Sequence, residues 1–345
     1  MIRQIQVGDV PVGGGAPVSI QSMLNTKTTD VEGSLRQLEA LKAAGCQIAR
    51  LAVPNEEAAR GFREIAAQSP LPLVADIHFD YKLALEAVAA GADKVRINPG
   101  NIGGADHVKA VAQACARRGV PIRIGVNGGS LEKPLLAKYG GVCPEAMVES
   151  AFGHIRLLNQ YDFDDICVSL KSSSVPMTMK AYQLMSQASN YPLHIGVTEA
   201  GTVRMGTLKS AVGIGGLLAL GVGDTMRVSL SADPVEEVYA ARDILKAAGI
   251  RKDGAELVSC PTCGRTRIDL ISLANEVEER LKAVDKPITV AVMGCVVNGP
   301  GEASAADCGI AGGVGEGLLF KKGQIIKKVP QDRLVDELFA LIDTL

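Results

Sequence analysis

The sequence of 345 residues contains no tryptophan, and aromatic residues make up only 3% of it. It has no marked excess of charge, because 36 basic side chains stand against 38 acidic ones and the formal net charge is -2. A nucleic-acid-binding protein would carry a basic domain, so nucleic acid is not an expected partner. No apolar run reaches the roughly 18 residues that a membrane helix needs, and the N-terminal segment lacks the apolar stretch of a secretory signal. We therefore expect a cytoplasmic protein with no membrane segment, whose 8 cysteines are thiols.

Between residues 18 and 231 the sequence repeats one pattern eight times, a short apolar run that ends in polar residues and is followed by a helical stretch. One such stretch is 31–44, which has leucines at helical spacing and stops at Gly45. Alternating strands and helices are typical of a parallel sheet, and eight units can close into a (β/α)8 barrel of the TIM type. An open doubly wound sheet is the alternative. The expected strands are Val18–Met23, Ile48–Val53, Leu73–His78, Lys94–Pro99, Ile122–Asn127, Ile166–Lys171, Leu193–Thr198 and Met226–Ser231.

The composition changes after about residue 250, which predicts a barrel domain over 1–250 and a smaller α+β domain over 251–345. Lys246–Glu256 is a plausible linker between them. The second domain is expected to contain a helix at Asp269–Ala283, a strand at Ile288–Met293, a hairpin at Leu318–Val329 and a final helix at Asp332–Leu345.

Charged side chains occur inside the expected barrel strands, where a packed core would exclude them. Within each strand, apart from the adjacent Thr198 and Glu199, the polar and charged residues are two or four positions apart, so they face the same side of the sheet. The outer face of a barrel is covered by helices, and burying an unpaired guanidinium costs several kcal/mol. Asp76 and Glu199 cannot neutralise the five cations that we expect at the C-terminal halves of the strands, so a phosphorylated small molecule is the predicted ligand. These cations are Arg50, Arg96, Arg123, Lys171 and Arg227.

Three cysteines of the second domain have the spacing of a metal site. Cys260 and Cys263 form a C-x2-C pair, and Cys295 follows on a separate glycine-rich loop. If Cys308 is the fourth ligand, four thiolates indicate structural zinc. If Glu302 is the fourth ligand, three thiolates and a carboxylate suit a [4Fe-4S] cluster with one labile iron. The spacing leaves both alternatives open.

Several segments together resemble one family. These are DIHFD at 76–80, KVRINPGNIG at 94–103, IRIGVNGGSL at 122–131, SLKSS at 169–173, GVTEAG at 196–201, SCPTCGR at 259–265 and GCVVNGPGE at 294–302. The sequence is similar throughout essentially its whole length to the 4-hydroxy-3-methylbut-2-en-1-yl diphosphate synthases of the non-mevalonate isoprenoid pathway, in their two-domain bacterial form.

The resemblance implies an iron–sulfur oxidoreductase that reduces 2-C-methyl-D-erythritol 2,4-cyclodiphosphate by two electrons, opening the ring and expelling water. It implies a [4Fe-4S] cluster held by Cys260, Cys263, Cys295 and Glu302, which leaves Cys308 as an ordinary thiol near the site. Flavodoxin or ferredoxin would donate the electrons. The resemblance also implies a homodimer in which the cluster domain of one subunit closes over the barrel of the other.

The resemblance assigns Glu302 to the labile iron. Glu199, near the end of the seventh expected strand, is our candidate for proton transfer, with Asp76 and His78 as weaker candidates. A zinc-stabilised binding protein and a zinc-dependent barrel aldolase or isomerase are the rival functions, and neither gives Glu302 a purpose. The residues expected to bind the substrate are Arg50, Asp76, Arg96, Asn98, Arg123, Asn127, Lys171, Arg204, Arg227 and Ser229.

Overall fold

The computed structural model describes residues 1–252, 254–296, 301 and 303–345. The chain divides into two compact units, Met1–Ile250 and Arg251–Leu345. None of the described helices is both long and apolar enough to cross a membrane. All eight cysteines are free thiols.

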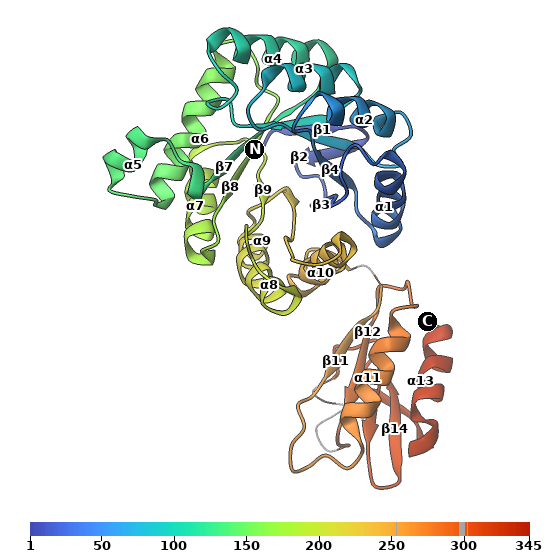
Figure 1. Cartoon of the computed structure of the whole chain (residues 1–345). Helices are drawn as coiled ribbons and strands as arrows, with labels where there is room; N and C mark the ends of the chain where they lie inside the picture. Colours follow the sequence, from blue (N-terminus) through green and yellow to red (C-terminus); the bar gives the residue numbers. More distant parts are fainter. Residues whose placement is uncertain (253, 297–300, 302) are drawn as a thin grey trace. The chain divides into compact units, whose positions relative to one another are not determined.

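The first unit is a parallel β-barrel surrounded by helices (Figure 1). Its strands run in the order β8-β7-β6-β5-β4-β3-β10-β9, and a parallel bridge between Val168 and Leu193 joins the two ends of this sheet. The expected (β/α)8 barrel is therefore confirmed, and the open doubly wound alternative is wrong. The strands are β3 (Ser19–Met23), β4 (Ile48–Ala52), β5 (Leu73–Asp76), β6 (Lys94–Ile97), β7 (Ile122–Asn127), β8 (Ile166–Lys171), β9 (His194–Ile195) and β10 (Thr225–Met226).

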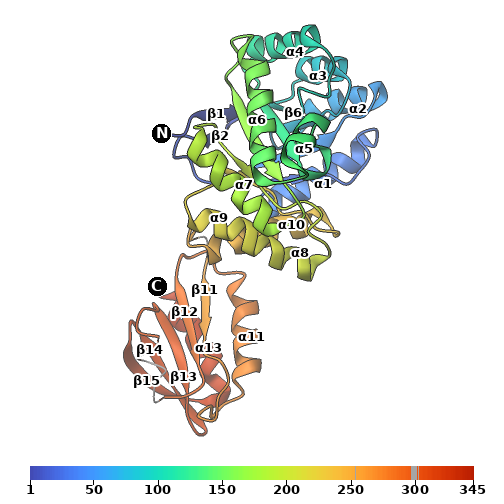
Figure 2. The ribbon, with the colours of Figure 1, turned by 90° about the vertical axis from the view of Figure 1, so that its left-hand side faces the viewer.

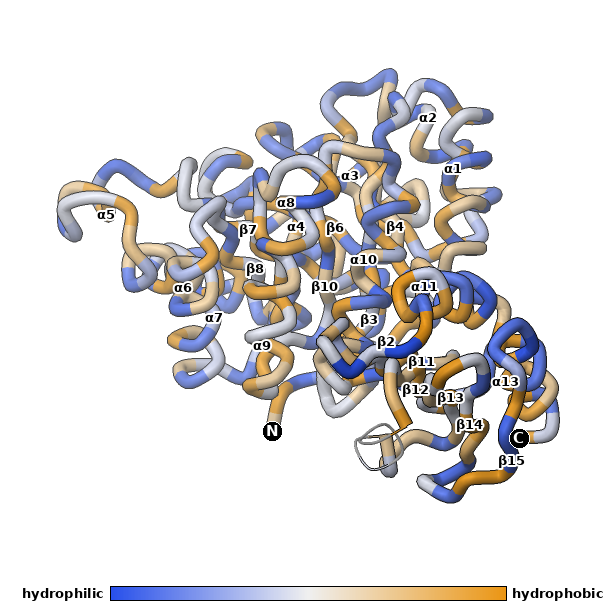
Figure 3. The backbone as a smooth tube through the Cα atoms, turned by 90° about the horizontal axis from the view of Figure 1, so that it is seen from below, coloured by the Kyte–Doolittle hydropathy of each residue, from blue (hydrophilic) through white to orange (hydrophobic). Residues whose placement is uncertain are grey.

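The barrel helices bury one side against the strands and expose the other, so hydrophobic and hydrophilic stretches alternate along them (Figure 3). In the first of them the Asp30 side chain caps the helix by accepting from the Gly33 N–H, and Gly45 ends it at a left-handed φ of 100°. The helices are α1 (Val31–Ala44), α2 (Glu56–Ala66), α3 (Tyr81–Ala89), α4 (Ala105–Arg118), α5 (Lys133–Tyr139), α6 (Pro144–Asn159), α7 (Val175–Ala188), α8 (Val203–Ser210), α9 (Gly216–Ala219) and α10 (Pro234–Ala247).

A hairpin closes the N-terminal end of the barrel, a feature that the sequence did not predict. It consists of β1 (Gln4–Val7) and β2 (Val10–Gly13). Its side chains Ile5, Val7 and Val12 pack against Ile48, Val74 and Cys167, which lie at or next to the first residue of their strands. The hairpin therefore covers the end of the barrel at which these strands begin.

The last two barrel strands are shorter than the sequence suggested. Both have two residues. After β9 the chain turns at Glu199, a non-glycine residue with a φ of 51°. The turn is fixed on both sides, since the Thr198 N–H donates to Ser172 O at 3.3 Å and the Ser231 N–H donates to Gly201 O at 2.9 Å.

The second unit is a five-stranded sheet in the order β11-β12-β13-β14-β15 with helices packed on it (Figure 2). The first three strands are parallel and the last two are antiparallel. The helices α11 (Leu270–Leu281) and α13 (Leu334–Asp343) share one hydrophobic core with the sheet. The strands are β11 (Glu256–Ser259), β12 (Thr289–Met293), β13 (Cys308–Gly312), β14 (Glu316–Lys321) and β15 (Gln324–Pro330). The sequence analysis indicated neither β11 nor β13.

Candidate active site

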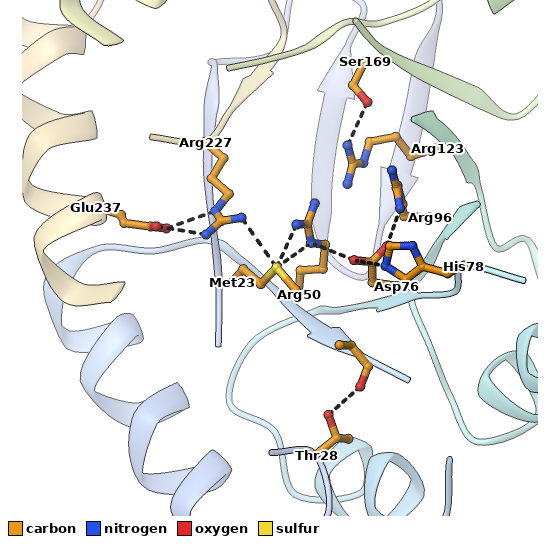
Figure 4. A network of polar contacts seen from close by, with 11 residues as sticks. Met23, Thr28, Arg50, Asp76, His78, Arg96, Arg123, Ser169, Arg227 and Glu237 are labelled. Atoms are coloured by element: carbon orange, nitrogen blue, oxygen red, sulfur yellow. Dashed lines mark hydrogen bonds and ion pairs between the residues drawn. The ribbon is translucent and has the colours of Figure 1, made fainter. Parts of the chain in front are cut away.

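Cationic side chains from several strands converge inside the barrel (Figure 4). Arg50 lies in the middle of β4, and Arg96 lies on β6 directly beside Arg123 of β7 in the strand register. Met23, the last residue of β3, is paired with Arg50 in the register. Its sulfur contacts the Arg50 guanidinium at 2.7 Å.

Asp76 is the buried anion at the centre of this group. Its Oδ1 accepts a hydrogen bond from Arg96 Nη1 at 3.1 Å, and its Oδ2 lies 3.6 Å from both Arg50 Nε and His78 Nε2. Burial alone would raise the pKa of this carboxyl, but the charge of Arg50 and the other contacts hold the pKa well below its usual range. Asp76 is therefore an anion that holds two arginines in place.

Arg227 has a carboxylate partner that the sequence analysis missed. Its Nε and Nη2 donate to the two oxygens of Glu237 on α10, at 3.0 and 2.9 Å. Glu237 is 3% exposed and also accepts from Ser22 Oγ at 3.0 Å and from the Leu230 N–H at 3.1 Å. The charge of Arg227 is thus balanced within the chain by a carboxylate other than Asp76 and Glu199, the two that we had expected near the five cations. No strand pattern could have revealed this partner, because it lies on a helix.

Arg123 and Lys171 are buried, with no carboxylate bonded to either within the described part of the chain. Arg123 is 1% exposed, and its Nη1 donates to Ser169 Oγ at 2.8 Å. Burial and the neighbouring charge of Arg96 lower the pKa of Arg123 to about 10. Burial and the charge of Arg123 likewise lower the pKa of Lys171 well below its usual value. The sequence had suggested that Arg123 lies in the C-terminal half of its strand. It is instead the second residue of β7.

Taken together, these contacts leave more positive than negative charge buried inside the barrel. Five cations gather here, and Asp76 and Glu237 are the carboxylates that the described residues bring to them. Burial and the charges of neighbouring cations lower the pKa values of Arg50, Arg123 and Lys171, so an added anion would stabilise the charged form of these three groups. Arginine forks suit phosphate oxygens, and a polyanion with several oxygens could engage several of these groups at once.

Two glycines on the inner wall leave room for the cationic groups. A Cβ at Gly125 of β7 would lie 2.4 Å from Arg96 Nε, and a Cβ at Gly196 would lie 2.7 Å from Lys171 Nζ. A side chain at either glycine would collide with the Arg96 guanidinium or the Lys171 ammonium in its observed position.

We predict that Gly125→Ala weakens anion binding with little loss of stability. The new methyl group must displace the Arg96 guanidinium from Asp76, and only the end of a flexible side chain has to move. Pyrophosphate affinity, measured by calorimetry, should fall about tenfold, the equivalent of one charge-assisted hydrogen bond. Gly129→Ala is the matched control, because a Cβ there would meet nothing within 4 Å. An unchanged affinity in Gly125→Ala would show that Arg96 does not contact the anion.

The remaining predicted site residues differ in their position and in how far they are buried. Asn127 is the neighbour of Lys171 in the strand register. Asn98 is buried, and its Oδ1 accepts from the Gly100 N–H at 3.1 Å, so part of its amide is used in its own turn. Ser229 is partly buried, whereas Arg204 and Glu199 are exposed.

The cysteine loops of the second unit lie side by side at the ends of β11 and β12. Cys260 directly follows β11, and its Sγ accepts a hydrogen bond from the Gly294 N–H at 3.2 Å. The Arg267 N–H donates to Gly294 O at 3.1 Å. Gly294 immediately precedes Cys295, so the two cysteine loops are held to each other by one backbone–sulfur and one backbone–backbone hydrogen bond.

The chemistry of this end of the sheet fits a thiolate-bound group. A backbone hydrogen bond at Arg265 lowers the pKa of the exposed Cys263 thiol, and a backbone N–H to sulfur bond is a contact that stabilises ligating thiolates. The described residues do not place three His, Cys, Asp or Glu side chains around one point. Glu302, the fourth expected ligand, lies outside the described residues.

Cys308 is not near these loops, contrary to the expectation of a thiol close to the site. It is the first residue of β13 and pairs in parallel register with Val290, near the start of β12. Cys295 follows the other end of β12, more than about 10 Å further along at 3.3 Å per residue. Cys308 is fully buried, and burial raises the pKa of its thiol to about 11. A four-thiolate zinc site that includes Cys308 is therefore excluded by the strand register.

Two family models match nearly the whole chain. The model described as the GcpE TIM-barrel domain matches residues 2–242, and the GcpE protein C-terminal domain matches residues 256–344. The chain belongs to the GcpE family. The family resemblance inferred from the sequence motifs is thereby confirmed.

Curated members of the GcpE family match along nearly their full length. A protein of Ruminiclostridium cellulolyticum is 57% identical over 340 residues, which are 99% of this chain and 96% of that protein. A protein of Geobacter sulfurreducens is 59% identical over 341 residues, or 99% and 97% of the two chains. Both are named 4-hydroxy-3-methylbut-2-en-1-yl diphosphate synthase (flavodoxin).

Solved structures resemble this GcpE chain in fold alone. A truncated 3-deoxy-D-arabino-heptulosonate 7-phosphate synthase from Thermotoga maritima has a TM-score of 0.53 at 12% identity, covering 72% of this chain and 94% of that one. Type I 3-dehydroquinate dehydratase from Clostridium difficile has a TM-score of 0.53 at 15% identity, covering 71% and 97%.

Proposed function

We propose that this chain reduces 2-C-methyl-D-erythritol 2,4-cyclodiphosphate with two electrons to 4-hydroxy-3-methylbut-2-enyl diphosphate, opening the ring and releasing water. The observation that carries the proposal is the surplus of buried positive charge inside the barrel, which calls for a compact polyanion. Membership of the GcpE family and the names of its curated relatives support the choice of substrate and reaction.

In this proposal the barrel binds and orients the diphosphate. Arg123 and Lys171 are buried cations without a bonded carboxylate in the described chain, so they would form the primary contacts. Arg50 and Arg96 would add contacts while Asp76 holds them in place. The further proposed contacts are Asn98, Asn127, Arg204, Arg227 and Ser229, of which Arg227 would act from its fixed position against Glu237.

A [4Fe-4S] cluster would be held by Cys260, Cys263, Cys295 and Glu302. When bound, such a cluster supplies electrons one at a time, and flavodoxin, printed in the relatives' names, is the proposed donor. The hydrogen bond from Gly294 to Cys260 Sγ would hold that thiolate in place. Cys308 has no part in this site.

Glu199 is the proposed proton-transfer residue. It lies four residues after the end of β9 and three after Gly196, at which a Cβ would lie 2.7 Å from Lys171 Nζ. Its left-handed backbone is held between the ends of β8 and β10. An unusual backbone conformation in a fixed turn beside a candidate site is a feature of functional residues.

The proposed cofactor is tested by metal analysis of anaerobically purified protein. We expect about four irons and four acid-labile sulfides per chain, with a broad visible absorption that air bleaches. Cys263→Ser should lose most of the iron and this absorption. Cys308→Ser is the matched control and should keep both, because its position excludes it from the site.

Zinc in place of iron, from iron-replete cells under anaerobic conditions, would contradict the redox proposal. So would an equal loss of iron in both variants. Turnover of the cyclodiphosphate with a chemical reductant then tests the reaction itself, and turnover with reduced flavodoxin tests the donor.

We further propose a homodimer whose active site is shared, with the cluster unit of one subunit serving the barrel of the other; the family resemblance supports this arrangement. A mixed dimer of one Cys263→Ser chain and one Arg123→Met chain tests it. Sharing predicts that about half of the wild-type sites are restored, because one barrel and one cluster unit remain intact in the same pairing. No recovery in isolated mixed dimers would show that each chain uses its own cluster.

A further inference from the structure

A second layer of polar side chains lies inside the barrel, apart from the groups assigned to the substrate. Its members are completely or almost completely buried, with exposures of 1% or less. They come from three strands on different sides of the barrel, and none has been used in the proposed function. They are Ser19 and Gln21 of β3, Lys94 of β6 and His194 of β9.

The neighbours of these residues show that their side chains point inward. Side chains alternate between the two faces of a strand. Ile20, Val95 and Ile195, which are next in sequence to members of the layer, belong to the core between the strands and the surrounding helices. The polar side chains therefore face the barrel axis. Arg123, flanked by the core residue Ile124, points inward in the same way.

Most polar atoms of this layer make no hydrogen bond to any described residue. These atoms are Ser19 Oγ, both amide atoms of Gln21, Lys94 Nζ and both ring nitrogens of His194. Arg123 Nε and Nη2 are also without a partner there, although Nη1 is bonded to Ser169. The charges of Arg123 and Lys94 both act on His194, and that of Arg123 acts on Lys94, so these groups lie close together. A buried polar atom without a partner costs about 1 to 3 kcal/mol, so several close together indicate a bound partner.

The missing partner has to accept hydrogen bonds and carry negative charge. An ammonium and a guanidinium are donors only, and the few acceptors in the layer cannot serve them all. Asp76, the nearby carboxylate, already contacts Arg50, Arg96 and His78. Burial, opposed by the neighbouring Cys167 thiol and reinforced by the charges of Arg123 and Arg50, lowers the pKa of Lys94 to about 8, so this ammonium has two like charges near it.

We propose that this layer binds one small inorganic anion of the chloride class between Lys94 and Arg123, so that Arg123 borders both this anion and the substrate diphosphate proposed above it. The interior of an eight-stranded barrel is only wide enough for side chains to fill, which favours a single-atom ion. Donors from β3, β6, β7 and β9 surround the axis, and a spherical ion accepts from every side. The apolar floor of Ile48 and Val74 against the hairpin closes the site from below. The proposal does not depend on the reaction.

Bromide serves as the probe, because it replaces chloride and scatters anomalously. Crystals of the full chain soaked in sodium bromide should show an anomalous peak inside the barrel, in contact with Lys94 Nζ. Crystals of Lys94→Met should lack it. Lys42→Met, a change of an exposed lysine on α1, is the control and should keep the peak. A wild-type barrel without a peak would overturn the proposal.

A second arm distinguishes a separate site from the lower end of the substrate site. Crystals soaked in bromide and pyrophosphate together should show both ions. Loss of the bromide peak when pyrophosphate binds would assign the anion to the substrate site and overturn a separate one.

Solution measurements cover the case in which Lys94→Met does not fold. The melting temperature of the wild-type protein should rise as the chloride concentration increases. The ionic strength is kept constant with the salt of an anion too bulky for the site. Gln21→Leu removes one donor and should raise the half-saturating chloride concentration about tenfold. A melting temperature that does not respond to chloride in the wild type would also refute the anion site.

Discussion

Arg123→Met is expected to weaken pyrophosphate and substrate binding about 100-fold or more while making the ligand-free protein more stable. Arg123 is a buried guanidinium without a carboxylate partner in the described chain, and removing a buried charge that contacts an anion costs about 2 to 5 kcal/mol of binding. The same burial lowers its pKa to about 10, which means that the folded chain is destabilised by keeping it charged. We expect the free energy of unfolding at pH 7 to rise by about 1 to 3 kcal/mol.

The opposite signs of these two effects make the test specific. Calorimetry measures the affinity and denaturant unfolding measures the stability. Arg242→Met on α10, an arginine whose Nη1 donates to Ala44 O outside the barrel, is the matched control and should leave the affinity unchanged. If Arg123→Met lost stability and kept its affinity, Arg123 would be a structural residue and the anion would bind elsewhere.

The same variant should also move the pH dependence of binding. In the ligand-free protein burial and Arg123 hold the pKa of Lys171 below its usual value, so Lys171 loses its proton as the pH rises through that lowered pKa. A bound diphosphate favours the charged ammonium and raises this pKa, so binding takes up a proton and affinity falls as the pH rises. Without Arg123 the pKa of Lys171 is less depressed, and the fall in affinity should begin at a higher pH.

Glu199→Gln is expected to reduce turnover by about 100-fold to 10,000-fold, the usual contribution of a general acid or base, with little change in substrate affinity. Glutamine keeps the shape of the side chain and removes its titrating proton. The exposed position of Glu199 and its fixed turn mean that the substitution should not disturb the fold. Single-turnover rates with a chemical reductant separate this step from electron delivery.

Glu57→Gln, a change of an exposed glutamate on α2, is the control for the loss of a surface carboxylate. Turnover near the wild-type rate in Glu199→Gln would remove Glu199 from the proton path. A large loss of affinity with normal turnover at saturating substrate would instead make it a binding residue.

Regular local patterns explain why much of the barrel could be predicted. The helix at Val31–Ala44 has the limits expected from its leucine spacing and Gly45, and β7 and β8 also have their expected limits. Each pattern depends on residues close together in sequence, and the alternation of strand side chains also showed which charges share a face. The hairpin β1–β2 was not predicted, because its burial depends on Ile48, Val74 and Cys167 far along the chain.

By itself the sequence determined the class of fold, the family and the presence of more cations in the barrel strands than local carboxylates can balance. These depend on spacing, composition and motifs, which are properties of the chain alone. Only the tertiary structure decided which charges are paired. It placed Glu237 of α10 on Arg227, Asp76 between Arg50 and Arg96, and Arg123 against Ser169. It also separated Cys308 from the cysteine loops. The physical reason is that the pairing and burial of a charge depend on distances in space between residues that are remote in sequence.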